Sequence, residues 1–289
     1  MSDSQDHADD VRRRILALRP GFEDSKARRS TLIRDIVLMH IGSNPACRSW
    51  STPGEIPRNL IRFWHDYSEL PDDVAACMAT WERLKEHGFS IRTFDDTSAD
   101  RYIRDRHGHR EVAAFNRCAH PAMRSDYLRL CVLLNEGGLY VDCDDVLLDD
   151  GWTRLFEDDR LKLQPLCYDI SAGGMMPSAD IWQTDLPAGE RIFYVNNDPI
   201  VAPPRHPVLQ RALCRATELL LQGDGRSEIQ ATTGPGNLTT VLAAHAHALL
   251  LRGDRLDFNL ICDWDVIAEM RWDLSYRKDE RNWRNVYGC

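Results

Sequence analysis

The chain has 289 residues, of which 43% are hydrophobic and 28% are charged, a balance typical of a globular protein with one large core or two modest ones. Its formal net charge of −9 argues against a general nucleic-acid or anionic-membrane surface, because either partner would carry charge of the same sign. We therefore expect no nucleic-acid partner.

The sequence also predicts a cytoplasmic protein with no membrane span. No stretch approaches the roughly 18 consecutive apolar residues needed to cross a bilayer, and the N-terminal MSDSQDHADDVRRR lacks the apolar core of a signal peptide. The nine cysteines are scattered and form no CxxC pair, so they predict neither a disulfide framework nor a zinc knuckle. We interpret most of them as buried thiols.

Residues 1–54 are predicted to form an N-terminal helical extension. Two segments in it, 9–22 and 25–42, carry apolar residues at helical spacing. The stretch SNPACRSWSTPGEIP, rich in proline and glycine, then separates this extension from a main domain over residues 55–289.

The main domain begins with alternating strand and helix signals. NLIRFWH (59–65) is short, apolar and β-prone, and residues 71–88 form an amphipathic helix pattern with an acidic start and a terminal glycine. A second strand pattern at 89–95 and a second helix pattern at 97–106 follow. This order favours an α/β sheet with helical crossovers.

The clearest helix, over residues 120–138, leads directly into an apolar strand, LYVD (139–142). Pro121 suits the first helical turn, and Gly137 or Gly138 can take the positive φ of a C-cap. An uninterrupted apolar strand is expected to be central in its sheet. Later in the chain, the sequence predicts a strand at 192–197 and helices at 206–223 and 234–253.

Asp142 and Asp144 follow the apolar strand. If the strand persists through Asp144, both carboxylates point the same way and Cys143 points into the protein. The carboxyl ends of such strands are where open α/β sheets bind ligands, and paired carboxylates suit Mg²⁺ or Mn²⁺. On spacing alone, an acidic surface turn stays the alternative.

The preceding helix places Asp126 and Arg129 three residues apart and hence on one face. A surface ion pair is the alternative interpretation of these two residues.

The stretch RSDYLRLCVLLNEGGLYVDCDD (124–145) resembles the core signature of the DxD-motif sugar transferases, which include the yeast initiating α-1,6-mannosyltransferase and the glucosylating clostridial toxins. That signature runs A-x-x-S-D-x-x-R, an apolar helix, then G-G-x-Y-x-D-x-D. The matching positions are Ser125, Asp126, Arg129, Gly137, Gly138, Tyr140, Asp142 and Asp144. Weaker similarities in IPRNLIRFWH, NNDPIVAPPRHPVLQRAL and TTGPGNLT extend the resemblance over roughly residues 56–245.

The resemblance implies a GT-A fold and a retaining hexosyltransferase that uses a UDP- or GDP-sugar donor and bound Mn²⁺ or Mg²⁺. The implied roles fall on six residues of this chain. Asp142 and Asp144 would bind the metal. Asp126 and Arg129 would be catalytic residues that hold the donor sugar or phosphate. The donor site would also include Asp142, Tyr140 and an exposed Trp64 stacked on the base.

The C-terminus departs from the family pattern, in which a histidine or a Ser-x-Trp element lies on a closing loop. This chain has no histidine after His247, and its candidate substitutes are Asp263, Asp265, Asp273 and Trp283. The acceptor, whether a small molecule, a glycan precursor or a protein, is not identified. The alternatives are a catalytically silent sugar-nucleotide binding module and a nucleotidyltransferase or sugar-nucleotide hydrolase.

Overall fold

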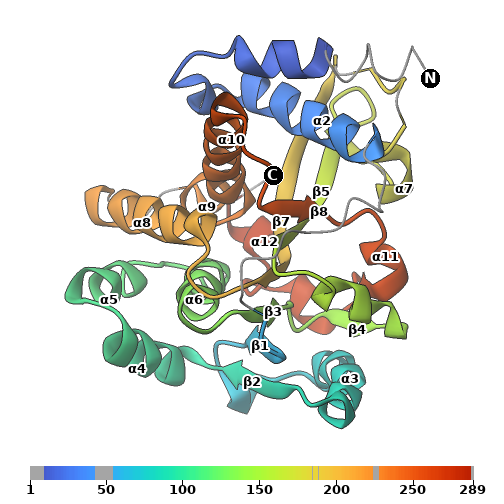
Figure 1. Cartoon of the computed structure of the whole chain (residues 1–289). Helices are drawn as coiled ribbons and strands as arrows, with labels where there is room; N and C mark the ends of the chain where they lie inside the picture. The colour runs from blue at the N-terminus through green and yellow to red at the C-terminus, as the bar shows by residue number, and fades with distance from the viewer. Residues whose placement is uncertain (1–9, 43–54, 184, 188, 224–227, 288–289) are drawn as a thin grey trace.

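One mixed β-sheet runs through the middle of the protein, with helices packed against it (Figure 1). The computed structural model describes residues 10–42, 55–183, 185–187, 189–223 and 228–287. Within these ranges the sheet has seven strands in the order β2-β1-β3-β7-β5-β6, with β8 paired to β5. The predicted α/β sheet flanked by helices is confirmed, and its GT-A type stays a prediction.

The sheet consists of β1 (Asn59–Phe63), β2 (Ser90–Phe94), β3 (Gly138–Tyr140), β5 (Leu161–Asp169), β6 (Gly174–Met175), β7 (Arg191–Ala202) and β8 (Phe258–Leu260). A separate two-stranded sheet pairs β4 (Asp145–Leu147) with β9 (Ala268–Met270). The α-helices are a helix at 10–16, α2 (Lys26–Gly42), α3 (Asp72–Thr80), α4 (Asp96–Arg106), α5 (His109–Phe115), α6 (Pro121–Glu136), α7 (Ser178–Ile181), α8 (Pro207–Gln222), α9 (Ile229–Thr232), α10 (Pro235–Arg252), α11 (Trp264–Ile267) and α12 (Trp283–Tyr287). Short 3₁₀-helices are η1 (Phe22–Asp24), η2 (Tyr67–Glu69), η3 (Trp81–His87), η4 (Asp150–Phe156) and η5 (Ser275–Lys278). Across the described ranges, none of the helices is both long and apolar enough to cross a membrane.

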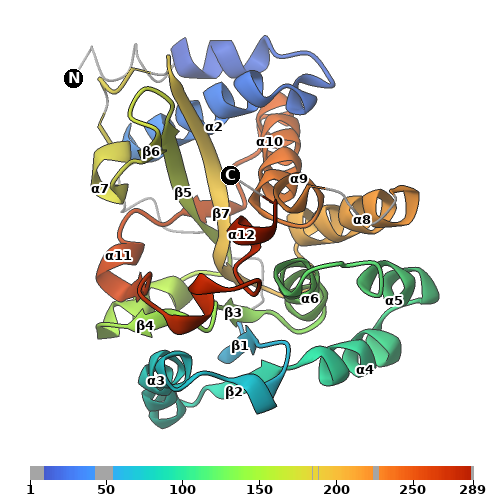
Figure 2. The ribbon, with the colours of Figure 1, turned by 180° about the vertical axis from the view of Figure 1, so that it is seen from behind.

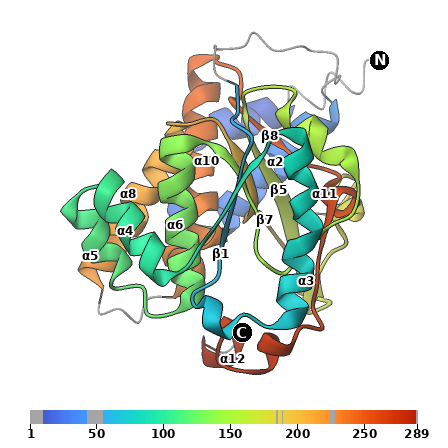
Figure 3. The same cartoon turned by 90° about the horizontal axis from the view of Figure 1, so that it is seen from below.

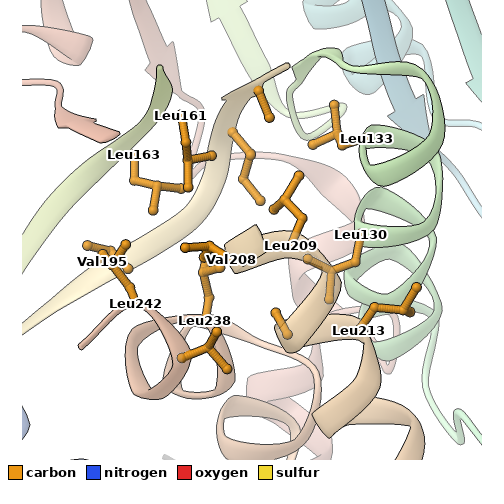
Figure 4. Close-up of a cluster of buried hydrophobic side chains, with 14 of the residues drawn as sticks. Leu130, Leu133, Leu161, Leu163, Val195, Val208, Leu209, Leu213, Leu238 and Leu242 are labelled. Atoms are coloured by element: carbon orange, nitrogen blue, oxygen red, sulfur yellow. The ribbon is translucent and has the colours of Figure 1, made fainter. Parts of the chain in front are cut away.

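Strand β3 is central and buried on both faces, as its apolar sequence predicted. Leu139 and Val201 belong to one hydrophobic core, and their neighbours Tyr140 and Ile200 belong to the other. This alternation is the period of two expected of adjacent strand residues. Figure 4 shows the larger core, where leucine and valine side chains from α6, α8 and α10 meet those of β5 and β7.

The direction of the strands decides where polar groups gather. Strands β2, β1 and β3 are parallel, so their carboxyl ends share one edge of the sheet. Strand β7 is antiparallel to β3, and Tyr140 pairs with Ile200. Residues 196–198 of β7 therefore extend to the same edge as the residues that follow β3.

The strand does not persist through Asp144. β3 ends at Tyr140, and residues 143–144 form a turn before β4. The backbone N–H of Asp142 donates to Oδ1 of Asp198 at 3.0 Å. A side chain of β7 therefore accepts the hydrogen bond that a backbone carbonyl would accept if the pairing of β3 with β7 continued. Cys143 is buried, as predicted, and its thiol contacts the carbonyl of Phe63.

The N-terminal helices pack on the main sheet. Helix α2 contacts β7, and Ile33, Ile36 and Val37 enter the larger core. The buried Arg34 donates to the carbonyl of Ile181 at 3.2 Å. Residues 43–54 lie outside the described ranges, so the predicted division between 1–54 and 55–289 stays a prediction.

The turn between α6 and β3 gives a test of this architecture. Gly137 and Gly173 both have a φ of +66°, but a Cβ at Gly137 would lie 2.8 Å from Pro204 and 2.9 Å from the carbonyl of Ala202, whereas a Cβ at Gly173 would meet nothing within 4 Å. We expect Gly137→Ala to lower the free energy of unfolding by about 3 kcal/mol and Gly173→Ala by about 1 kcal/mol. Urea denaturation measures both, and equal losses would contradict the close approach.

Candidate active site

A cavity of about 400 Å³ opens at the carboxyl edge of the parallel strands. Its walls come from the ends of β1 and β3, the first half of α6, the middle of β7 and the C-terminal part of the chain. Figure 2 shows this C-terminal part, with α12, lying in front of β7. Five of the predicted site residues line the cavity: Trp64, Asp126, Arg129, Asp142 and Asp144.

Arg129 makes several buried polar contacts at the wall of the cavity. It is 3% exposed, donates to Oδ1 of Asp142 at 2.9 Å, and lies 3.2 Å from Oδ1 of Asp126. Burial alone would lower the pKa of this guanidinium, but Asp142 and other neighbouring groups raise it overall. Arg129 therefore stays charged and fixes two carboxylates at once.

Tyr140 does not line the cavity, and its predicted contact with the donor stays a prediction. Its ring is fully buried beneath the guanidinium of Arg129, 4.0 Å from the ring centre. Its hydroxyl lies 2.6 Å from Oγ of Ser125 and donates to Oδ1 of Asp142 at 2.9 Å. Tyr140 therefore orients Asp142 from behind the wall of the cavity.

Asp126 is held by residues from two other segments. Its Oδ1 accepts from Asn197 at 2.7 Å, and its Oδ2 accepts from Thr233 at 3.1 Å. Burial raises the pKa of Asp126 to about 6, although the charge of Arg129 opposes the shift. Asn197 and Thr233 were not predicted as site residues, but both lie in the weakly similar segments NNDPIVAPPRHPVLQRAL and TTGPGNLT.

Asp142 and Asp144 belong to a larger group of carboxylates. Asp145 and Asp198 also line the cavity and are 1% and 3% exposed. Both carboxylate oxygens of Asp145, and Oδ2 of Asp198, have no hydrogen-bond partner among the described residues. Burial, followed by repulsion from neighbouring carboxylates, raises the pKa of Asp144, Asp145 and Asp198.

These carboxylates fit a hard divalent cation. Asp126 and Asp142 share the guanidinium of Arg129, and Asp144 pairs with Arg277, whereas both oxygens of Asp145 and Oδ2 of Asp198 have no hydrogen-bond partner among the described residues. A cation would favour the ionised form of these buried carboxylates. No set of three or more His, Cys, Asp or Glu side chains in the described ranges is arranged to hold a metal. Mg²⁺ does not need such a set, because it is commonly bound through one or two carboxylates plus substrate phosphates and water.

Trp64 lines the cavity but is not the exposed indole that the sequence predicted. It is 7% exposed, because it belongs to a small hydrophobic core that includes Val74, and the ring of Tyr276 packs edge-on against it at 5.3 Å. Its Nε1 is buried and has no hydrogen-bond partner in the part of the chain that the structure describes.

The C-terminal segment contributes different residues from those we proposed. Of the four candidates, Asp265 and Trp283 line the cavity and Asp263 and Asp273 do not. Direct contact with Asp144 comes instead from two residues that the sequence did not single out. Tyr276 donates to Oδ2 of Asp144 at 2.6 Å, and Arg277 forms an ion pair with the same oxygen.

One comparison with known proteins, a family match, covers part of this site. Residues 71–159 match the family described as "Glycosyltransferase sugar-binding region containing DXD motif". This region contains Asp126, Arg129, Asp142 and Asp144, so the predicted resemblance to DxD-motif glycosyltransferases is confirmed there. No curated protein sequence matches the chain. Among solved structures, PaToxG glycosyltransferase is similar with a TM-score of 0.45 and 15% identity, over 92% of this chain and 97% of that one.

The raised pKa of Asp126 gives a test of the site. An aspartate that ionises at 3.8 in the unfolded chain and near 6 in the folded protein makes the free energy of unfolding fall as pH rises through this window. Asp126→Asn lacks this titration. We expect it to gain roughly 2–3 kcal/mol relative to the wild type between pH 4 and pH 7. Urea denaturation with EDTA measures the difference, and a constant difference would contradict the shift.

Proposed function

We propose that this protein is a retaining, metal-dependent glycosyltransferase that moves a hexose from a UDP- or GDP-sugar to an acceptor. The observation that carries the proposal is the uncompensated carboxylate group around Asp142 and Asp144. It lies in a cavity at the edge of the sheet where α/β proteins bind ligands, within the region that matches the DXD glycosyltransferase family.

Asp142 and Asp144 are the residues that would hold Mn²⁺ or Mg²⁺. When bound, such an ion would offset the negative charge that develops on the diphosphate as the glycosidic bond breaks, and so would favour the transition state over the ground state. Tyr140 and Arg129 fix the Oδ1 atom of Asp142 by two hydrogen bonds of 2.9 Å each. The carboxylate is therefore oriented before any ligand arrives, which avoids reorganisation during the reaction.

Asp126 is the residue we assign to the donor sugar. A carboxylate has about four acceptor sites, and Asn197 and Thr233 use one on each oxygen, so Asp126 can still accept from sugar hydroxyls. Arg129 donates from Nε and Nη2 to neighbouring protein groups and from Nη1 to the carbonyl of Asn197. We therefore assign Arg129 mainly to holding Asp126 and Asp142, with one Nη1 hydrogen left for a donor oxygen.

We assign Trp64 to the nucleotide base. Its indole lines the cavity and offers a flat apolar face at little entropic cost. Tyr276 packs against this indole. The nucleotide base and the ring of Tyr276 would therefore compete for, or share, the surface of Trp64.

Retention of configuration is proposed to follow same-face substitution with internal return. The bond between the anomeric carbon and the diphosphate breaks, the acceptor oxygen bonds to the same face, and the leaving phosphate oxygen takes the acceptor proton. This route needs no nucleophilic side chain. A double displacement needs a carboxylate beneath the anomeric carbon, and a trapped glycosyl-enzyme adduct detected by mass spectrometry would contradict internal return.

Two other activities would use the same carboxylates, and their products distinguish them from a glycosyltransferase. A sugar-nucleotide hydrolase would release free sugar without an acceptor, and a nucleotidyltransferase would release pyrophosphate. A catalytically silent module would bind the donor without turnover. The cytoplasmic location stays a prediction.

The metal assignment predicts a defined loss in one variant. We expect Mn²⁺ with UDP-sugars or GDP-sugars to raise the unfolding temperature of the wild type, because a ligand that binds only the folded state stabilises it. Asp144→Asn should lose this shift and the Mn²⁺-dependent hydrolysis of the donor. Asp150→Asn, an exposed aspartate that does not line the cavity, is the matched control and should keep both. Full activity in Asp144→Asn would refute the assignment.

A further inference from the structure

The C-terminal segment (residues 271–285) lines the cavity and is anchored at two points. On one side, Ser275 donates from its backbone N–H and its hydroxyl to Asp73 of α3, at 2.6 and 3.0 Å. On the other, the carbonyl of Glu280 lies 3.0 Å from Nε2 of His120, at the start of α6. Figure 3 shows α12 and the chain before it at this end of the molecule, with α3 and α6 above. Between the anchors, Tyr276 and Arg277 line the cavity.

Arg277 lies between these anchors and points at Asp144. Its side chain is 11% exposed, and its Nη2 forms an ion pair with Oδ2 of Asp144. Nε donates to the carbonyl of Arg271 at 3.2 Å, and the guanidinium carbon lies 4.5 Å from the ring centre of Trp272. The backbone contact and the aromatic face hold the guanidinium at the cavity wall independently of Asp144.

A metal ion and Arg277 would compete for the carboxylate of Asp144. Oδ2 already accepts from Tyr276 and Arg277. A divalent cation on this carboxylate would place like charges a few ångströms apart in a buried site, where repulsion is much stronger than in water. Binding of the cation must therefore weaken or break the ion pair to Arg277.

The released guanidinium would find a new partner in the donor. A diphosphate bound through a cation at Asp144 brings phosphate oxygens next to the wall that holds Arg277. The planar fork of a guanidinium matches phosphate oxygens and forms charge-assisted hydrogen bonds with them. The same side chain would therefore oppose binding of the cation alone and favour binding of the cation with the diphosphate.

We propose that Arg277 is a ligand for the diphosphate of the donor, and that Asp144 holds its guanidinium until a divalent cation takes over this carboxylate. The inference rests on the proposed function, since it needs a nucleoside diphosphate and a cation at the same site. It implies that the cation and the nucleotide each raise the affinity for the other.

The test is the affinity of Arg277→Gln for two probes, measured by isothermal titration calorimetry. Mn²⁺ alone should bind several-fold more tightly than to the wild type, because a competing cation has been removed. UDP and GDP, titrated in saturating Mn²⁺, should show binding about tenfold weaker or more for whichever nucleotide the wild type accepts, because a charge-assisted contact is lost. These opposite shifts would not arise from a general loss of structure.

Two further variants keep the test decisive. Arg271→Gln removes an exposed positive charge from the same segment, from a side chain that does not line the cavity, and should leave both affinities within about twofold of the wild type. Arg277→Lys keeps the charge but not the planar fork, so Mn²⁺ binding should stay near the wild-type value while nucleotide binding weakens. It also serves if Arg277→Gln does not fold.

The outcomes separate this inference from the proposed function. If the wild type binds Mn²⁺ and a nucleotide, but both Arg277 variants bind them unchanged or bind both more weakly, Arg277 is not the diphosphate ligand and the proposed function stands. If the wild type binds neither Mn²⁺ nor any nucleotide, the proposed function fails and the role of Arg277 fails with it.

Discussion

Buried negative charge at the edge of the sheet is the constraint on which the rest of the site depends. Asp142, Asp144, Asp145 and Asp198 line one cavity, and three of them are at least nine-tenths buried. Charged groups removed from water are tolerated only when they are paired or bind a cation. The guanidinium groups of Arg129 and Arg277 compensate part of this charge, and the remainder gives the site its expected affinity for a divalent cation.

The fold creates this arrangement from short local features. The tight turn at Gly137 lets α6 pass directly into β3, so Arg129 on the helix reaches back to Asp142 beyond the strand. Strand β7 then runs antiparallel to β3 and delivers Asn197 and Asp198 to the same edge. The C-terminal segment lines the cavity and supplies the second cationic group. Each contribution comes from a different part of the chain.

Local patterns predicted the elements that local forces stabilise. The helix over 120–138 and the strand after it were recognisable from apolar spacing and from proline and glycine at the ends, and the carboxylates were located through them. Strand β5 was missed because Pro165 interrupts it at an irregularity in its pairing with β7, and because the buried Lys162 and Gln164 disguise its apolar pattern. The contacts of Tyr276 and Arg277 with Asp144 span more than 130 residues, so no local signal could predict them.

The most direct test of this account is an X-ray structure of the protein grown with Mn²⁺ and a nucleoside diphosphate, with the metal located by its anomalous signal. We expect a peak within coordination distance, about 2.0–2.3 Å, of a carboxylate oxygen of Asp144 or Asp142, and the guanidinium of Arg277 moved from Asp144 to a phosphate oxygen. An ion pair between Arg277 and Asp144 that persists with nucleotide bound and no anomalous peak beside either aspartate would contradict the central claim.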